Sequence, residues 1–477
     1  MLFGTLEFFI FFAAVFCIWL IIPLHYRWVV LLGASYYFYF TWNPSYIFIL
    51  AFCSVASWWL AVQFAAGKKA PNRRYLFVLA VIANLGPLLF YKYYTFFTDS
   101  LSSAVSQAGF QSPFPHLEIL LPVGISFFTL QAISYSADVY QGKIEPERHP
   151  GIFALYLSFF PRLISGPIER GKNLLPQLRE GKPFDSGLFL SGVRLFFWGL
   201  FMKLVLADRM GMYVDMVYSR PADYWGKTVI IGALLYTLQI YCDFSAYMNM
   251  AIGCGRIFGI ELSNNFNFPY MARSIGDFWR RWHITLTTWF RDYVYIPMGG
   301  KRVSVSRWAV NIMIVFLLSG LWHGAAWTFV IWGGLHGFFY LFGRFTAPAR
   351  MGLLKVLGLH ENFIVPFQMV VTFLLVAFAW IFFRAESVQD AVMIISHMFI
   401  NVSAPPRMMA SQFSTYLSWA AAFVFVFLEL IRYWDAAAGA RFSSSIPTFL
   451  KYPAYAIILL ATSLLGASST KFIYFHF

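Results

Sequence analysis

Long apolar runs recur along almost the whole chain, and short polar or charged links separate them. A membrane-crossing helix needs about 20 apolar residues, and a shorter run is more typical of a half-buried or re-entrant segment. The pattern predicts an all-α polytopic membrane protein with about 11–13 membrane helices, plus interfacial or re-entrant helices. Good candidate spans lie near residues 7–24, 45–66, 75–91, 117–136, 188–207, 228–250, 309–325, 326–343, 366–384, 415–432 and 452–468, and shorter runs cover 28–41 and 150–166.

The segment 274–297 interrupts this pattern, because it is both charged and rich in tryptophan. Ser274 followed by Asp277 is a capping-box pattern that starts a helix. Its apolar positions have helical spacing and its charged positions lie opposite them, which predicts one amphipathic interfacial helix ending before Pro297. His283 falls at the edge of the apolar arc, where it is either a structural or a functional histidine. The apolar positions are 275, 278, 279, 282, 286, 289, 290 and 293.

The apolar segment 309–337 carries two further histidines. His323 lies between Gly320 and Gly324, and two helix glycines in such a run indicate a close approach by backbone or ligand. Histidine in a membrane segment is costly, and its pKa near 6.5 suits a general base, so His323 is either functional or structural. His336 is a weaker functional candidate, and its role could be limited to a hydrogen bond between helices. Ser319 is a further polar residue of the same run.

Asp243 lies inside the apolar run 228–250, with tyrosine and serine hydroxyls nearby. A carboxylate in a membrane segment is usually paired with a cation or a hydroxyl. Asp243 therefore either makes a structural hydrogen bond or lines a cavity.

The composition excludes several function classes. The chain is 60% hydrophobic and only 12% charged, against about 25% charged residues in soluble domains. The net charge of +14 fits basic loops beside anionic lipid, and no basic domain outside the membrane segments indicates nucleic-acid binding. The cysteines form no CxxC, so we expect no zinc site or disulfide framework. No GxSxG, HExxH, Walker A or Rossmann motif is present.

Two of these segments resemble the membrane-bound O-acyltransferase (MBOAT) family, and most closely its branch for alginate O-acetylation and D-alanyl transfer to teichoic acids. They read DFWRRWHITLTTWFRDYVYIPMGG (277–300) and LSGLWHGAAWTFVIWGGLHG (318–337). Supporting similarity lies at residues 31–44, 121–142, 163–178 and 241–270, and in the terminal FIYFHF (472–477).

The resemblance implies one membrane-embedded domain over residues 1–477, with a ring of spans around a thin centre and a tunnel. It assigns the catalytic histidine of LWHG to His323 and the second functional histidine of RRWH to His283. It also implies a multi-pass protein of the bacterial inner membrane, with no bound cofactor and an acyl thioester such as acetyl-CoA as donor. An extracytoplasmic partner with an SGNH-like fold would complete transfer to the glycan, with membrane lipid and a polysaccharide synthase complex as further partners.

The resulting hypothesis is acetyl transfer to an exopolysaccharide, such as alginate or cellulose. His323 would act as general base, and His283 would orient the thioester or share the proton. The tunnel would be lined by Trp279, Trp282 and Trp322, which would exclude water. Arg280 and Arg281 would either steer the donor or anchor the helix. The alternatives are D-alanyl transfer to teichoic acid, or a transporter of polysaccharide or lipid without chemistry.

Overall fold

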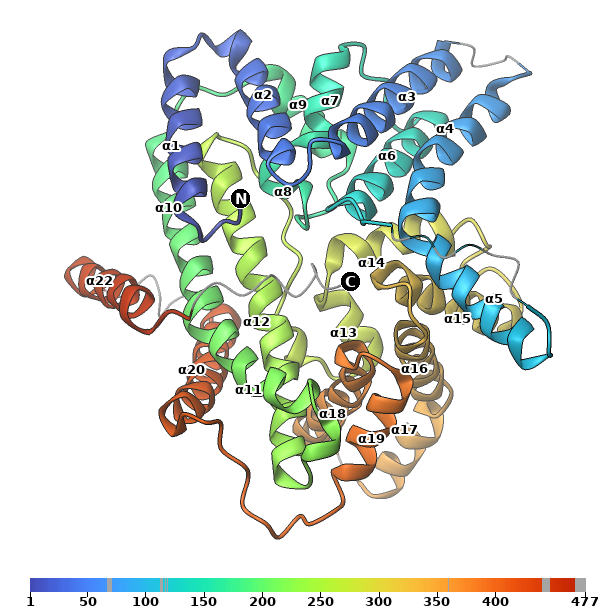
Figure 1. Ribbon diagram of the computed structural model, residues 1–477, viewed down its shortest axis with the longest axis vertical. Coiled ribbons are helices and arrows are strands. Elements are labelled where there is room, and N and C mark those ends of the chain that lie inside the picture. The colour runs from blue at the N-terminus through green and yellow to red at the C-terminus, as the bar shows by residue number, and fades with distance from the viewer. Residues whose placement is uncertain are drawn as a thin grey trace. The chain divides into compact units, whose positions relative to one another are not determined.

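The structure is a computed structural model that describes residues 1–66, 71–111, 115, 117, 119–358, 360–439 and 447–467. Every regular element within these residues is a helix, which confirms the all-α class (Figure 1). The terminal FIYFHF segment lies outside the described residues.

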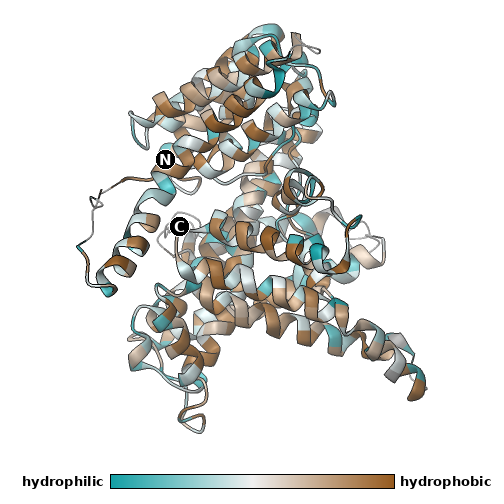
Figure 2. Cartoon of the chain, turned by 90° about the vertical axis from the view of Figure 1, so that its right-hand side faces the viewer, coloured by the Kyte–Doolittle hydropathy of each residue, from teal (hydrophilic) through white to brown (hydrophobic). Residues whose placement is uncertain are grey.

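Seven helical stretches in the described part of the chain are long and apolar enough to cross a membrane. This supports a polytopic membrane protein, although the number is lower than the 11–13 predicted from hydropathy alone. Two further apolar helices, near the two ends of the chain, are shorter than such a span. Hydrophobic residues run along most helices (Figure 2), and many large apolar side chains are exposed, as expected for surfaces that face lipid. The ring of spans with a tunnel stays a prediction.

The chain forms two compact units. The first contains Met1–Phe196 and Met250–Ser263, and the second contains Phe197–Asn249 and Asn264–Phe477. A single domain over the whole length remains the expectation from the sequence.

In the first unit, α3, α4 and α6 pack together, and α2 packs against α7. The two short runs predicted near 28–41 and 150–166 form α2 and the pair α7 and α8. Its elements are α1 (Leu6–Ile21), η1 (Leu24–Tyr26), α2 (Arg27–Phe40), α3 (Tyr46–Ala66), α4 (Arg73–Leu88), the π-helical η2 (Leu89–Tyr93), α5 (Tyr94–Gln107), α6 (Ile125–Tyr140), α7 (Pro150–Ser158), α8 (Phe160–Leu163), α9 (Gly171–Glu180) and most of α10 (Ser186–Phe201).

The second unit carries all of the candidate site residues. Its α16 packs against α15, α13 and α18, and α11 packs against α20. Its elements are the π-helical η3 (Met202–Ala207), α11 (Asp208–Tyr218), η4 (Pro221–Asp223), most of α12 (Lys227–Ile257), η5 (Pro269–Met271), α13 (Ile275–Arg281), α14 (Ile284–Phe290), the π-helical η6 (Arg291–Tyr295), α15 (Val305–His323), α16 (Trp327–Phe345), α17 (Ala347–Val356), η7 (Glu361–Ile364), α18 (Val365–Arg384), α19 (Val388–His397), α20 (Gln412–Ala437) and α22 (Thr448–Leu465).

Candidate active site

The predicted single amphipathic helix over 274–297 is wrong, because the chain breaks at His283. The start of the prediction holds: Ser274 Oγ accepts a hydrogen bond from Asp277 N at 3.1 Å and caps α13. Helix α13 ends at Arg281, and α14 begins at Ile284. Between them His283 adopts a left-handed conformation with φ 43°. Its side chain is fully buried, not placed at the border of a helix face.

Asn265, which is distant in sequence, stabilises this break. Its carbonyl oxygen accepts from Ile284 N at 3.0 Å, and its side-chain Oδ1 accepts from Thr285 N at 2.9 Å and Thr285 Oγ1 at 2.8 Å. These bonds satisfy backbone donors that a helix start leaves open. The periodicity of 274–297 is compatible with one helix, so the break depends on a tertiary contact that the pattern does not contain.

The break brings His283 beside His323. Helix α15 starts at the Ser304 cap, where Ser304 Oγ accepts from Arg307 N at 3.4 Å, and His323 is its last residue. The two imidazole centroids are 6.3 Å apart. His323 is 3% exposed and His283 is 0% exposed. Burial lowers the pKa of His283 to about 3, so this ring is neutral at physiological pH.

The glycines beside His323 permit close packing, as the sequence predicted. A Cβ on Gly320 would lie 2.2 Å from the carbonyl oxygen of Phe329, and one on Gly324 would lie 2.1 Å from the Phe329 ring. Gly333 on α16 is equally restricted, because its Cβ would lie 2.3 Å from the Phe316 oxygen. The glycines therefore serve the contact between α15 and α16 that places His323. Ser319, also buried, lies one turn before His323 on the same helix.

Aromatic rings surround the two histidines. Trp322 lies 5.9 Å from the His283 ring, and Phe244 lies 4.9 Å from it. Trp332 lies 5.0 Å from the ring of His323. Sequence reasoning missed Trp332, since nothing distinguishes it from the other tryptophans of the chain.

His336 belongs to the same aromatic cluster but is one ring further away. Trp332 contacts both histidines, since its ring centroid lies 5.0 Å from that of His336 and 5.0 Å from that of His323. Trp279 Nε1 donates to His336 Nδ1 at 3.3 Å, which joins α13 to α16. That bond fits the interhelical role predicted for His336, and it places Trp279 against His336.

The remaining candidates of α13 and its C-terminus are a buried tryptophan and two arginines, of which Arg280 is exposed and Arg281 is half-buried. Trp282 is fully buried and packs against Trp380 in a tilted arrangement, with ring centroids 5.1 Å apart. Arg280 and Arg281 both pair with Asp277, at 3.2 Å each, and Arg281 also donates to Asn267 O at 3.3 Å. These contacts favour the anchoring role for the two arginines.

Asp243 belongs to a buried ionic cluster. Lys203 Nζ lies 2.8 Å from both Asp243 Oδ1 and Asp208 Oδ1, and the three side chains are at most 9% exposed. Of the two alternatives for Asp243, this ion pair supports the structural one. Lys203 and Asp208 were missed, although a lysine inside the apolar run 188–207 was a visible signal.

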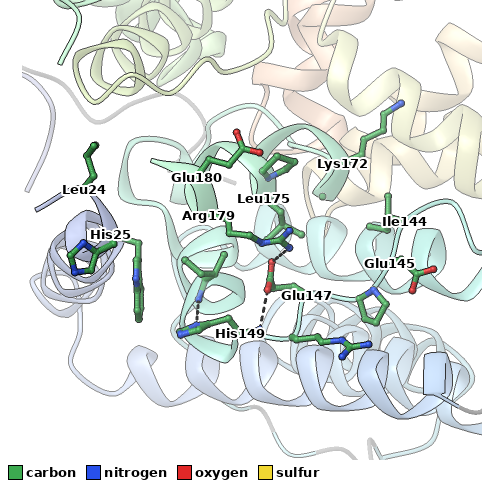
Figure 3. A pocket seen from close by; sticks show the side chains of 16 residues that line it. Leu24, His25, Ile144, Glu145, Glu147, His149, Lys172, Leu175, Arg179 and Glu180 are labelled. Atoms are coloured by element: carbon green, nitrogen blue, oxygen red, sulfur yellow. Dashed lines mark hydrogen bonds and ion pairs between the residues drawn. The ribbon is translucent and has the colours of Figure 1, made fainter. Parts of the chain in front are cut away.

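A cavity of about 960 Å³ opens in the first unit, where no candidate residue lies (Figure 3). Glu147 pairs with Arg179 and accepts from His149 N at 2.9 Å inside it. Its charged lining is balanced, with three glutamates (Glu145, Glu147 and Glu180) and three strong bases (Arg148, Lys172 and Arg179). This balance does not favour an anionic ligand.

The chain is similar to curated proteins of one family. It is 38% identical to the probable alginate O-acetylase AlgI of Pseudomonas aeruginosa over 78% of this chain and 70% of that protein. It is 34% identical to the peptidoglycan O-acetyltransferase of Helicobacter pylori over 78% of this chain and 73% of that protein. Identity to the teichoic acid D-alanyltransferase of Bacillus subtilis is 28%, over 60% of this chain and 73% of that protein.

The family comparison gives the same family that the two histidine segments resemble. The family model described as "MBOAT, membrane-bound O-acyltransferase family" matches residues 126–352, which include both His283 and His323. With the two relatives above 30% identity covering most of both chains, this protein belongs to the membrane-bound O-acyltransferase family.

Proposed function

We propose that this protein is a membrane O-acetyltransferase that takes an acetyl group from a cytoplasmic thioester for O-acetylation of a polysaccharide. The observation that carries the proposal is the buried pair of His283 and His323, whose rings lie 6.3 Å apart. Two relatives above 30% identity, named for O-acetylation of alginate and of peptidoglycan, support the acetyl group and the glycan class. An exopolysaccharide such as alginate or cellulose is the final acceptor we propose, reached through an extracytoplasmic partner.

His323 acts as the general base in the proposed reaction. It takes the proton of an acceptor hydroxyl while that oxygen attacks the thioester carbonyl. The tetrahedral intermediate collapses by breaking the carbon–sulfur bond, and the imidazolium returns its proton to the departing thiolate. The acetyl group is then an ester of the acceptor, and the donor is a free thiol. Base catalysis of this kind contributes roughly 10²–10⁴-fold in rate.

His283 is proposed to orient the thioester or share the proton. Its low pKa keeps it neutral, so it can donate through one nitrogen and accept through the other. The indole of Trp322, close to both histidines, would exclude water that competes with the acceptor, while Trp279 and Trp282 support the surrounding wall.

The proposed setting is the bacterial inner membrane. Acetyl-CoA or another acyl thioester is the donor, and the chain needs no bound cofactor in this scheme. An extracytoplasmic SGNH-like partner receives the acetyl group, within a complex that includes the polysaccharide synthase.

D-alanyl transfer to teichoic acid is the second candidate, favoured by the 28% identity to the Bacillus subtilis transferase. The two candidates use the same thioester chemistry and differ in the acyl group. A turnover assay with acetyl-CoA and the purified protein with its partner distinguishes them, because a D-alanyl enzyme would leave acetyl-CoA intact. A transporter without chemistry would also leave it intact.

The test of the catalytic proposal is acetyl transfer by His323→Ala and His283→Ala. We expect His323→Ala to lose roughly 10²–10⁴-fold in rate, because the base is gone. The matched control is His360→Ala, which changes an exposed histidine away from the cluster. Normal acetylation by a stably expressed His323→Ala protein would overturn the scheme.

A further inference from the structure

A second cavity, in the unit that carries the histidines, has a different electrostatic character. It holds about 910 Å³ and is bounded by parts of α13, α15, α16 and α17. Four strong bases line it: Arg280, Lys301, Arg344 and Arg350. No aspartate or glutamate lines it, unlike the balanced cavity of the first unit.

These bases have little internal compensation. Arg280 pairs with Asp277, and that carboxylate is shared with Arg281. Lys301, Arg344 and Arg350 take part in no ion pair among the described residues. A cavity with this excess of positive charge favours an anionic ligand.

The start of α15 adds to this preference. Val303 and Val305 line the cavity on either side of the Ser304 cap, so the N-terminal end of a 19-residue helix adjoins it. A helix N-terminus carries partial positive charge and free backbone donors, which suit a phosphate group.

An apolar surface begins at the rim of the cavity. Phe345 lines the cavity and is exposed, and Phe342 and Phe338 continue from it along α16 at spacings of three and four residues. Residues with this spacing share one helix face. The Phe338 and Phe342 rings stack at 5.9 Å, and all three side chains are more than half exposed. A soluble phosphate ligand would leave these three phenylalanines exposed, whereas the acyl chains of a lipid would cover them.

Two further aromatic residues, Trp308 and Tyr340, line the cavity. Trp308 lies 6.0 Å from Phe345 and 6.4 Å from Tyr340, and its Nε1 donates to Tyr295 OH at 3.1 Å. Tryptophan and tyrosine beside basic residues at helix ends are typical of the membrane interface. Basic pockets between membrane helices are also typical sites for anionic lipid headgroups.

We propose that this cavity binds the headgroup phosphate of an anionic phospholipid, whose acyl chains lie along the Phe338, Phe342 and Phe345 face of α16. The site is separate from the proposed acetyl chemistry. The lipid site and the histidine cluster both contact α13. Gly276 of α13 lies against Tyr340 in the cavity wall, and Trp279 of the same helix donates a hydrogen bond to His336.

Lipid binding to the purified full-length protein in an uncharged detergent tests the proposal. Dioctanoyl phosphatidylglycerol is the probe, and dioctanoyl phosphatidylcholine, with equal chains and no net charge, is its control. We expect tighter binding of the anionic lipid. The double variant Lys301→Gln/Arg344→Gln should weaken it roughly 25-fold, since each cation near a lipid headgroup contributes about fivefold.

The control variant is Arg302→Gln/Arg307→Gln, which removes two neighbouring charges that do not line the cavity. It should change binding by less than about threefold. If the double variant does not fold, the single variants Lys301→Gln and Arg344→Gln replace it, each expected to weaken binding about fivefold.

Two further probes separate the lipid from other phosphate compounds. Inorganic phosphate and coenzyme A carry phosphate without acyl chains, and we expect neither to displace the lipid at equal concentration. Displacement by either probe would overturn the proposal, because the apolar face would then contribute nothing. Unchanged phosphatidylglycerol binding by the Lys301→Gln/Arg344→Gln protein would overturn it as well.

Discussion

At the scale of single residues, His283 and His323 are the same residue type in two different backbone settings. His323 ends a regular helix, and its position follows from the packing of α15 on α16. His283 has a positive φ, a conformation in which histidine is enriched among residues other than glycine but still strained. Strain of this kind gathers at functional sites, where the surrounding structure maintains it.

The buried neutral state of His283 makes stability depend on pH. Its pKa is lowered to about 3, whereas the ordinary value is 6.5. Between these values the unfolded chain binds a proton here that the folded chain does not, so stability falls as the pH drops below 6.5. At about pH 5 this histidine should cost about 2 kcal/mol. Thermal unfolding of the wild type and of His283→Asn at neutral and acid pH measures it.

Asparagine is the chosen replacement because it tolerates the left-handed conformation. Any constant loss of packing cancels when each protein is compared with itself at two pH values. The wild type should lose more stability on acidification than the variant. Equal losses would contradict a depressed pKa at His283.

A second prediction at the scale of single residues concerns Lys203. Lys203→Met removes the cation that lies 2.8 Å from both Asp208 and Asp243, and breaking a buried pair in this way costs about 3–5 kcal/mol. We expect a large fall in the unfolding midpoint of the detergent-solubilised protein.

Asp215→Asn is the matched control for Lys203→Met, because its pair with Arg384 is partly exposed and should contribute under about 1 kcal/mol. A Lys203→Met protein as stable as the control would show that the buried cluster does not stabilise the fold.

At the scale of elements, the position of His323 depends on close contact between the backbones of α15 and α16. Gly320 and Gly333 face each other across α15 and α16, where the Cα of each lies within 3.4 Å of the other's constructed Cβ. Small residues at such crossings allow membrane helices to pack by van der Waals contact and short interhelical distances. The position of His323 therefore depends on residues one turn away from it.

Gly320→Ala tests this contact. Its Cβ would overlap a backbone oxygen at 2.2 Å, so the helices must separate, and we expect lower stability together with reduced acetyl transfer. Gly334→Ala on α16 is the control, since its nearest neighbour is Leu317 at 3.7 Å. An alanine there should be neutral or stabilise by up to about 1 kcal/mol. Equal behaviour of the two variants would count against the close contact.

At the scale of the whole molecule, apolar helices outweigh the net charge of +14 in setting how the protein associates with a membrane. We expect the protein to stay in the membrane fraction after washes with high salt and with alkaline carbonate, and to be released by detergent. Basic surface charge alone would be screened by salt. Release of the protein by either wash would contradict the multi-pass assignment; fractionation followed by immunoblotting measures it.

Several features of the site could be predicted from the sequence because they are local. The Ser274 cap, the helix end before Pro297, and the close approach at Gly320 and Gly324 each follow from a few neighbouring residues. Hydropathy likewise indicated the membrane helices, and seven helical stretches in the described part of the chain are long and apolar enough to cross. A short apolar run has the same composition whether it crosses the membrane or lies buried in the protein.

The sequence by itself determined the membrane class, the helical fold and the two histidine segments, since apolar length and residue type are properties of the chain alone. Only the tertiary structure decided that the helix breaks at His283, because Asn265 must come from elsewhere to bond Ile284 and Thr285. It also decided that Lys203 meets Asp243 and that Trp332 contacts both His323 and His336. The pairings of Asn265 with Ile284 and of Lys203 with Asp243 join residues of different elements, so packing selects them and periodicity does not record them.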